Sequence, residues 1–228
     1  MDFRRIPSSH SATEPVPYTV SGELVPVLEF ELDDTGDIYF EHYVLLYKQP
    51  SVRLAAAMPK GALRRAIGKM PVLLARATGN GRLALSRDGA GQVVGIPVQA
   101  GSSLAVREHQ FLAATGSLAY GFSRVRGISN LLFGGSGFFV DQFSAERTDG
   151  TVWLHAYGNL TEVLLGPGEV LEVEPGGWCY KDASVRMSTS VLNLAAGIFA
   201  SQSFTVNRFE GPGRLGIQSM TVYMPTEE

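Results

Sequence analysis

Cysteine is almost missing from this chain, which has a single one, Cys179, among its 228 residues. One cysteine excludes a disulfide within the chain and fits a reducing compartment. Long apolar runs are also missing, because no uninterrupted stretch reaches the roughly 18 residues that a membrane-spanning helix needs. The first residues carry charge but no apolar core, so they do not have the pattern of a secretory signal. We therefore expect a cytoplasmic protein.

Charge is scarce as well. Charged residues make up 18% of the chain and the formal net charge is -3, which gives no sign of a general nucleic-acid-binding surface. Apolar residues make up 45%, and a chain of this length can bury roughly 75% of its unfolded surface without a metal or a disulfide. No internal stretch has the composition of a linker, so we expect an extended N-terminal arm over residues 1–19 and a single domain over residues 20–228.

A repeated hairpin is the clearest feature that the sequence does contain. Residues 206–215 repeat residues 74–83 without a gap, 132 positions later, and a middle copy of the second half lies at residues 150–154. The positions of the first copy with identical partners in the last are Arg76, Gly79, Gly81, Arg82 and Leu83. Each copy has the pattern of a strand, a glycine turn and a second, alternating strand.

A second repeated segment alternates with this hairpin. Residues 38–41, 104–107 and 171–174 are spaced 66 and then 67 positions apart, and each follows a glycine-containing turn. Together the two segments define about three units of roughly 65 residues each. Short strands at regular spacing with frequent glycine turns are typical of a sandwich or barrel. We therefore predict an all-β, β-sandwich-like domain with three internal pseudo-repeats.

The order and spacing of short glycine motifs resemble those of the altered-inheritance-of-mitochondria-twenty-four family. The motifs are residues 132–139 (LFGGSGFF), 158–160 (GNL), 166–169 (GPGE) and 209–215 (FEGPGRL), followed by Gln218. The resemblance covers roughly residues 20–223. It implies a double-stranded β-helix-type fold, similar to that of the tryptophan RNA-binding attenuation protein (TRAP-like), with pseudo-threefold symmetry and oligomers. It brings no catalytic residues to this chain.

Four histidines, His10, His42, His109 and His155, raise the question of a metal site. Such a site in a β-helix fold needs two closely spaced histidines and a carboxylate that converge on one cation. Here no His-x-His pair occurs, and the repeat places His42 and His109 at similar positions of two different units. We interpret them as surface turn histidines and expect no metal.

Two further motifs have a chemical and a structural interpretation. Cys179 would need a base or a positive field to act as a nucleophile, but the repeat aligns it with the apolar Leu46 and Leu112, so we expect a small buried side chain. Residues 211–216 (GPGRLG) match the G-x-G-x-x-G dinucleotide pattern, which requires a helix after it. The equivalent turn at residues 79–81 leads into an alternating strand, so we predict a hairpin turn and no cofactor.

Basic residues gather in the connecting segments. Before the three hairpins the chain has Lys60, Arg64, Arg65 and Lys69, then Arg124 and Arg126, then Arg186. If the repeats are related by rotation, these connectors emerge near one end of the domain and form a positive face suited to the phosphates of an anionic membrane or a nucleic acid. The alternative is ordinary solvated loop charge.

Two further surfaces bear on binding. The outward positions that we assign on the second hairpin strands, Arg82, Trp153, His155 and Arg214, contain no row of base-stacking aromatics, so we do not expect RNA binding. The apolar segment at residues 128–139 contains Leu131, Leu132 and Phe133 between small residues. It is either core strand, at least from residue 138 onward, or a surface that contacts another subunit or a membrane.

The sequence thus favours a non-enzymatic β scaffold that associates with itself and presents a surface to a partner, because repeated core and turns take up nearly the whole chain. One alternative is a peripheral protein that binds anionic membranes or nucleic acid through the basic connectors. Another is a metal-dependent enzyme of the β-helix type that acts on a small molecule. No small-molecule ligand is evident from the residues.

Overall fold

A computed structural model describes residues 1–5, 16–57, 74–125, 138–192 and 204–221 of the chain. Within these ranges every regular element is a strand, apart from one short 3-10 helix, η1 (His42–Val44). All strand pairs are antiparallel. The predicted all-β class is confirmed.

The strands fall into three consecutive sets, which we call units one, two and three. Unit one contains β3 (Val27–Leu32), β4 (Ile38–Glu41), β5 (Leu45–Lys48), β6 (Arg53–Ala57), β7 (Leu74–Thr78) and β8 (Gly81–Ser86). Unit two contains β9 (Gly91–Val98), β10 (Ser103–Arg107), β11 (Phe111–Thr115), β12 (Ala119–Val125), β13 (Phe138–Ser144) and β14 (Gly150–Tyr157). Unit three contains β15 (Leu160–Leu165), β16 (Val170–Val173), β17 (Trp178–Asp182), β18 (Arg186–Leu192), β19 (Phe204–Glu210) and β20 (Gly213–Gln218).

Each unit pairs its strands in the same way. The first, sixth and third strands lie side by side in that order, as β3-β8-β5, β9-β14-β11 and β15-β20-β17. The fourth, fifth and second strands form the other set, as β6-β7-β4, β12-β13-β10 and β18-β19-β16. The predicted threefold internal repeat is therefore confirmed at the level of strand topology.

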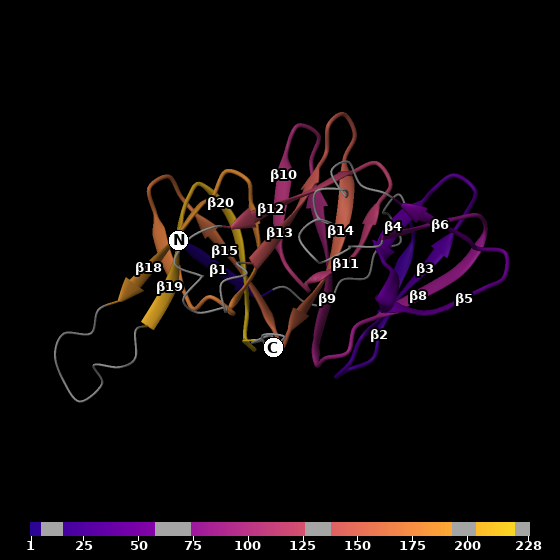
Figure 1. Ribbon diagram of the computed structural model, residues 1–228, viewed down its shortest axis with the longest axis horizontal. Coiled ribbons are helices and arrows are strands. Elements are labelled where there is room, and N and C mark those ends of the chain that lie inside the picture. Colours follow the sequence, from indigo (N-terminus) through magenta and orange to yellow (C-terminus); the bar gives the residue numbers. More distant parts are fainter. Residues whose placement is uncertain (6–15, 58–73, 126–137, 193–203, 222–228) are drawn as a thin grey trace.

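The units are joined by exchanged strand pairs. The second strand of one unit pairs with the third strand of the next, β4 with β11 and β10 with β17. These pairs fuse half of each unit with half of its neighbour into one sheet. Figure 1 shows the result, a row in which unit two lies between unit one and unit three.

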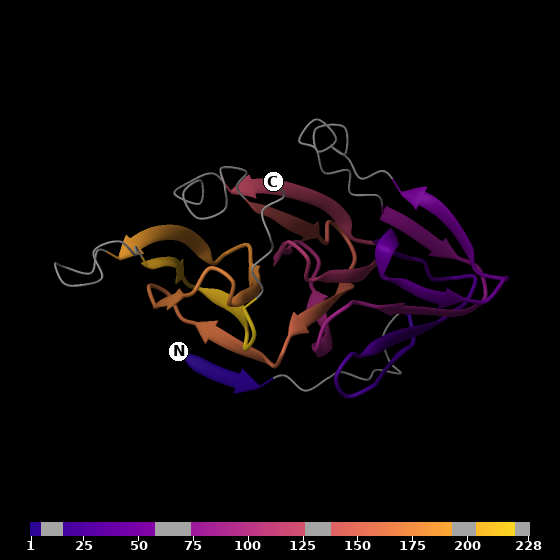
Figure 2. The ribbon, with the colours of Figure 1, turned by 60° about the horizontal axis from the view of Figure 1, so that its bottom comes forward.

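The segment before unit one also adds strands. β1 (Asp2–Arg5) pairs with β15 of unit three, and β2 (Tyr18–Ser21) pairs with β3 of unit one. β1 and the first half of β2 belong to the region predicted as an arm, residues 1–19, of which residues 6–15 lie outside the described residues. Figure 2 shows β1 on the outside of unit three, far along the row from β2. The segment therefore contacts both outer units.

Alternation builds the core, as in β3, where Leu28, Phe30 and Leu32 are buried. The cores are shared between units. Trp153 of unit two packs in the core of unit one, with its ring centroid 4.7 Å from that of Phe30. The exchanged strands thus give each junction an apolar core as well as backbone hydrogen bonds.

The solvent exposure that we expect for one face of the middle unit is wrong. Trp153 and His155 are expected on the outer face of their strand, but both are fully buried. Every residue of β14 is buried, because unit one and β2 cover the face that would otherwise meet solvent. The other two residues assigned to the outer face, Arg82 and Arg214, are equivalent to Thr151 in the repeat; Arg82 is exposed and Arg214 is half-buried.

Candidate functional site

The two junctions between units have the same register. In the first, Phe40 lies opposite Ala113 and Tyr39 opposite Ala114. In the second, Val106 lies opposite Tyr180 and Ala105 opposite Lys181. These are equivalent positions of the repeat, so one interface is used twice within the chain.

A β-bulge fixes the same alignment inside all three units. The third strand of each unit skips one residue where it pairs with the sixth strand, and the skipped residues are Leu46, Leu112 and Cys179. This bulge confirms the alignment of Cys179 with the two leucines. It also makes Tyr47 of β5 the counterpart of Ala113 in β11 and of Tyr180 in β17.

The burial of this third strand differs sharply between the units. Leu112 and Ala113, and likewise Cys179 and Tyr180, are fully buried at the two junctions. In β5, which no described strand pairs on its outer edge, Leu46 is 54% exposed and Tyr47 is 46% exposed. The outer edge of β5 is therefore a junction surface without a neighbour.

A buried charged cluster lies where units one and two meet. The guanidinium of Arg87, which follows β8, donates from Nη2 to Glu41 at 2.7 Å and to the backbone oxygen of Phe111 at 2.6 Å. Nη1 donates to the hydroxyl of Tyr43 at 3.2 Å, and that hydroxyl donates to Glu41. Because Glu41 belongs to unit one and Phe111 to unit two, Arg87 ties the two units together.

Burial and charge act in opposite directions on Arg87. Burial lowers the pKa of Arg87, but the Glu41 carboxylate and the Tyr43 hydroxyl raise it by more. The guanidinium therefore stays charged. Burial raises the pKa of Tyr43, and Glu41 adds to the effect. The cluster is thus a fixed ion pair whose acceptors are occupied within the chain. Sequence reasoning missed this cluster, because Arg87 looks like an ordinary turn residue.

The histidines near this cluster are neutral at pH 7. Burial, together with the charge of Arg87, lowers the pKa of His155 to about 4. Burial also lowers the pKa of His109, against the opposing effect of Glu108. His42 is exposed in η1, and His10 lies outside the described residues. The prediction of surface histidines therefore fails for His155.

The remaining predicted chemistry can be placed for two motifs. Cys179 is fully buried, and burial raises the pKa of its thiol to about 12, as a packing role predicts. Residues 211–216 lead from β19 into β20, so a strand follows the glycine pattern where a dinucleotide site needs a helix. The predicted strand after the turn is confirmed, but the hairpin is wrong: β19 pairs with β16 and β18, and β20 with β15 and β17, so the turn joins strands of two different sheets.

The second junction is held by a glutamine. The Gln218 side-chain oxygen accepts from the backbone N–H of Tyr157 at 3.1 Å, and its amide donates to the backbone oxygen of Gly176 at 2.9 Å. Tyr157 belongs to unit two and Gly176 to unit three. Gln218, one of the residues that carry the family resemblance, therefore links units in a different way from Arg87.

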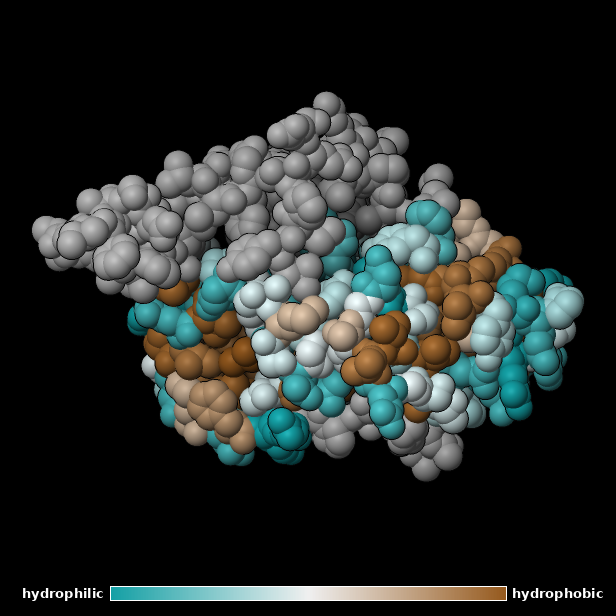
Figure 3. Space-filling view, turned by 90° about the horizontal axis from the view of Figure 1, so that it is seen from below, coloured by the Kyte–Doolittle hydropathy of each residue, from teal (hydrophilic) through white to brown (hydrophobic). Residues whose placement is uncertain are grey.

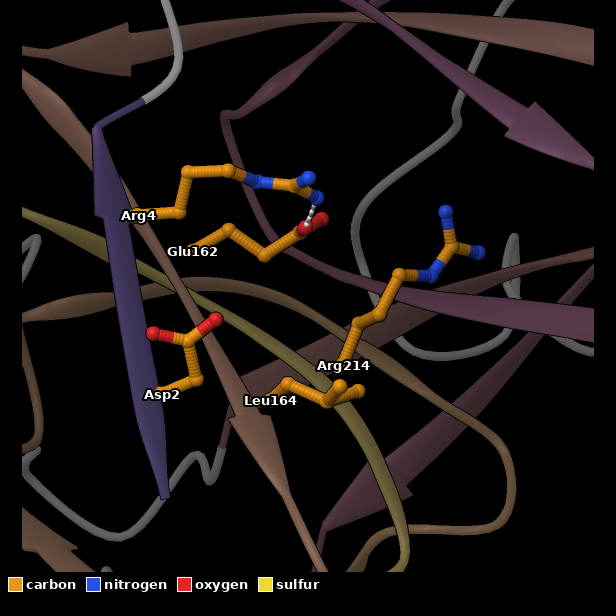
Figure 4. A pocket seen from close by; sticks show the side chains of 5 residues that line it. All are labelled: Asp2, Arg4, Glu162, Leu164 and Arg214. Atoms are coloured by element: carbon orange, nitrogen blue, oxygen red, sulfur yellow. Dashed lines mark hydrogen bonds and ion pairs between the residues drawn. The ribbon is translucent and has the colours of Figure 1, made fainter.

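A shallow hollow of about 130 Å³ lies where β1 crosses unit three. It is lined by Asp2, Arg4, Glu162, Leu164 and Arg214 (Figure 4). Arg4 donates to Glu162 at 2.6 Å, and Tyr180 donates to the same carboxylate at 2.5 Å. Arg214, on the other side of the hollow in Figure 4, is engaged with Asp182 at 2.9 Å. These charges are paired within the chain, which favours a structural role for the hollow.

A second hollow, of about 140 Å³, is lined by Tyr39, Ala57, Leu74, Arg76, Gly116, Leu118 and Tyr120. Both hollows are well below the roughly 300–1,000 Å³ of sites that enclose small molecules. In the described parts of the chain no group of three or more His, Cys, Asp or Glu side chains is placed to hold a metal ion.

Most of the predicted partner surface falls outside the described residues. This applies to Lys60, Arg64, Arg65, Lys69 and Arg126, and to the apolar Leu131, Leu132 and Phe133. Arg124 belongs to β12 but its side chain is not described, and Arg186 is exposed beside Glu210. The connectors occupy the same place in each unit, between the fourth and fifth strands. Their binding role stays a prediction.

On the face seen from below, apolar side chains lie in separate patches, one at the left of the view and others from its centre to the right (Figure 3). Among the segments that the structure covers, no helix has the length and apolarity needed to cross a membrane.

Comparisons with known proteins agree with this architecture. The model of a family described as mitochondrial biogenesis AIM24 matches residues 18–220. A crystal structure of a Streptococcus pyogenes protein is similar, with a TM-score of 0.69 and 22% identity, over 90% of this chain and 94% of that one. At this identity the likeness supports the fold alone. None of the curated proteins matches the chain.

Proposed function

Because the chain belongs to the mitochondrial biogenesis AIM24 family and ends its row of units on an exposed junction strand, we propose that it is a non-enzymatic β scaffold that associates with further copies of itself. The observation that carries the proposal is the exposure of Leu46 and Tyr47 on β5. Their counterparts are fully buried at both internal junctions. Apolar side chains on an unpaired strand edge are costly to leave in water, and a partner strand would cover them.

The buried polar groups support a scaffold role. Arg87, Glu41 and Gln218 have their hydrogen bonds within the chain and link neighbouring units. His155 is buried and neutral at pH 7, away from either hollow. A scaffold uses such groups to fix the position of one unit against the next.

Self-association is tested by sedimentation velocity and light scattering across a wide range of concentration. We expect the weight-average mass to rise above that of one chain as the concentration increases. A mass that stays at one chain at every concentration would overturn the proposal.

Three finer expectations accompany this proposal. We propose the TRAP-like, double-stranded β-helix description on the family resemblance, and the threefold strand topology supports it. We propose a cytoplasmic location because a single cysteine fits a reducing compartment. Binding to an anionic membrane or nucleic acid through the basic connectors is the second hypothesis, and a metal-dependent enzyme the third; both rest on the sequence alone.

A further inference from the structure

The row of units has two unequal ends. Inside the chain, the second strand of a unit always pairs with the third strand of the following unit. By this rule β16, the second strand of unit three, would pair with the third strand of a further unit, and β5, the third strand of unit one, with the second strand of another. Among the strands that the structure describes, none pairs with the outer edge of either.

The burial of β16 mirrors that of β5. Leu171 is half-buried, whereas its counterparts Ile38 and Leu104 are buried inside the two junctions. Glu172 is exposed, whereas its counterparts Tyr39 and Ala105 are buried. The two ends therefore present the two halves of the interface that the chain already uses twice.

The internal register predicts how the two ends would meet. Transferred to β16 and β5, it places Val173 opposite Tyr47, Glu172 opposite Lys48 and Leu171 opposite Gln49. Glu172 and Lys48 are both exposed and carry opposite charges. Opposite charges at directly facing positions stabilise an antiparallel pair, and like charges destabilise it. Neither internal junction has a charge pair there, since Ala114 faces Tyr39 and Lys181 faces Ala105.

We propose that β16 of one copy pairs antiparallel with β5 of a second copy, in the register of the internal junctions, so that the row of units continues from chain to chain. This inference rests on the proposed self-association and names its surface. The partner is a second copy because β5 and the β16–β19 pair lie at opposite ends of the row (Figure 1). The contact is head-to-tail, which gives a ring if the rotation between copies closes and a filament if it does not.

Charge reversal tests the register. Lys48→Glu places two carboxylates opposite each other, and Glu172→Lys places two ammonium groups there. We expect each variant to associate about tenfold more weakly than the wild type at low salt, because an attractive pair becomes a repulsive one. The double variant Lys48→Glu/Glu172→Lys restores opposite charges and is expected to regain most of the association. Equilibrium sedimentation measures all three.

Arg53→Glu is the matched control. Arg53 is exposed on β6, whose counterparts β12 and β18 also end their sheets, so this edge forms no junction within the chain. The control is expected to associate like the wild type. Glu172→Lys also removes an exposed pair with Arg208 at 3.7 Å, a surface contact whose loss leaves the fold intact.

The outcomes separate this inference from the function on which it rests. If the wild type associates but both single reversals behave like Arg53→Glu, or the double variant does not recover, the scaffold function stands and the β5–β16 contact is wrong. If the wild type does not associate at all, the proposed function itself fails.

Discussion

Replacing Arg87 by methionine is expected to lower the free energy of unfolding by about 3–5 kcal/mol. The guanidinium is almost fully buried and holds Glu41, Tyr43 and the backbone oxygen of Phe111. Its removal leaves a carboxylate inside the junction without a cation, and a single partner of a buried pair is costly when left alone. Urea denaturation at pH 7 measures the change.

The double variant Arg87→Met/Glu41→Leu removes both charges together, and we expect it to be more stable than Arg87→Met. Arg186→Met is the control, because Arg186 pairs with Glu210 while 76% of its side chain is exposed. A surface pair of this kind contributes at most about 1 kcal/mol. Equal losses for Arg87→Met and Arg186→Met would contradict the role of Arg87 as the link between units one and two.

Truncating Trp153 to alanine is expected to cost a similar amount, about 3–5 kcal/mol. Its ring is fully buried and makes edge contacts with Phe30 of β3, at 4.7 Å, and with Tyr18 of β2, at 5.3 Å. The change therefore opens a cavity between unit two, unit one and β2. Calorimetry or denaturant titration measures the loss.

Trp153→Phe separates packing from hydrogen bonding at this position. The indole Nε1 has no hydrogen-bond acceptor among the described atoms, so phenylalanine keeps most of the apolar contact and removes a buried N–H without a partner. We expect it to cost less than about 1.5 kcal/mol. If Trp153→Ala were as mild as Trp153→Phe, the shared core between the units would not be supported.

The repeat could be predicted from the sequence because each copy contains the same short-range residue patterns. Glycine turns and alternating aliphatics predict strands at residues 81–86, 150–155 and 213–218, and β8, β14 and β20 lie there. The glycines that begin β8 and β20 share a conformation, since Gly81 and Gly213 both have φ near +139°, which few other residues adopt. The identical glycines at these two positions therefore indicate the same local backbone conformation.

The junctions could not be predicted in the same way. Alternation along a strand separates two faces but does not say whether the second face meets solvent or another unit. Trp153 and His155 were therefore expected to be exposed, although another unit covers their face. Strand exchange between β4 and β11 joins residues far apart in the sequence, which local periodicity does not encode. Glu41, a carboxylate at the end of an apolar strand, was the one available signal of the buried cluster.

The assembly follows from the same repeat. A chain that buries one interface twice and exposes its two halves at opposite ends needs no new surface to bind a further copy. The pair formed by Glu172 and Lys48 gives the outer contact a facing charge pair that the internal ones lack, and it supplies specificity rather than most of the affinity.

Cross-linking across this contact tests the account most directly. Lys48→Cys and Glu172→Cys chains are mixed and mildly oxidised, with Cys179 fully buried and unavailable. We predict a disulfide between position 48 of one chain and position 172 of the other, identified by mass spectrometry of the linked peptides. The register control is Leu171→Cys, which the alternation of a strand turns to the opposite face. Absence of the 48–172 link, or equal linking to position 171, would contradict head-to-tail pairing of the end strands.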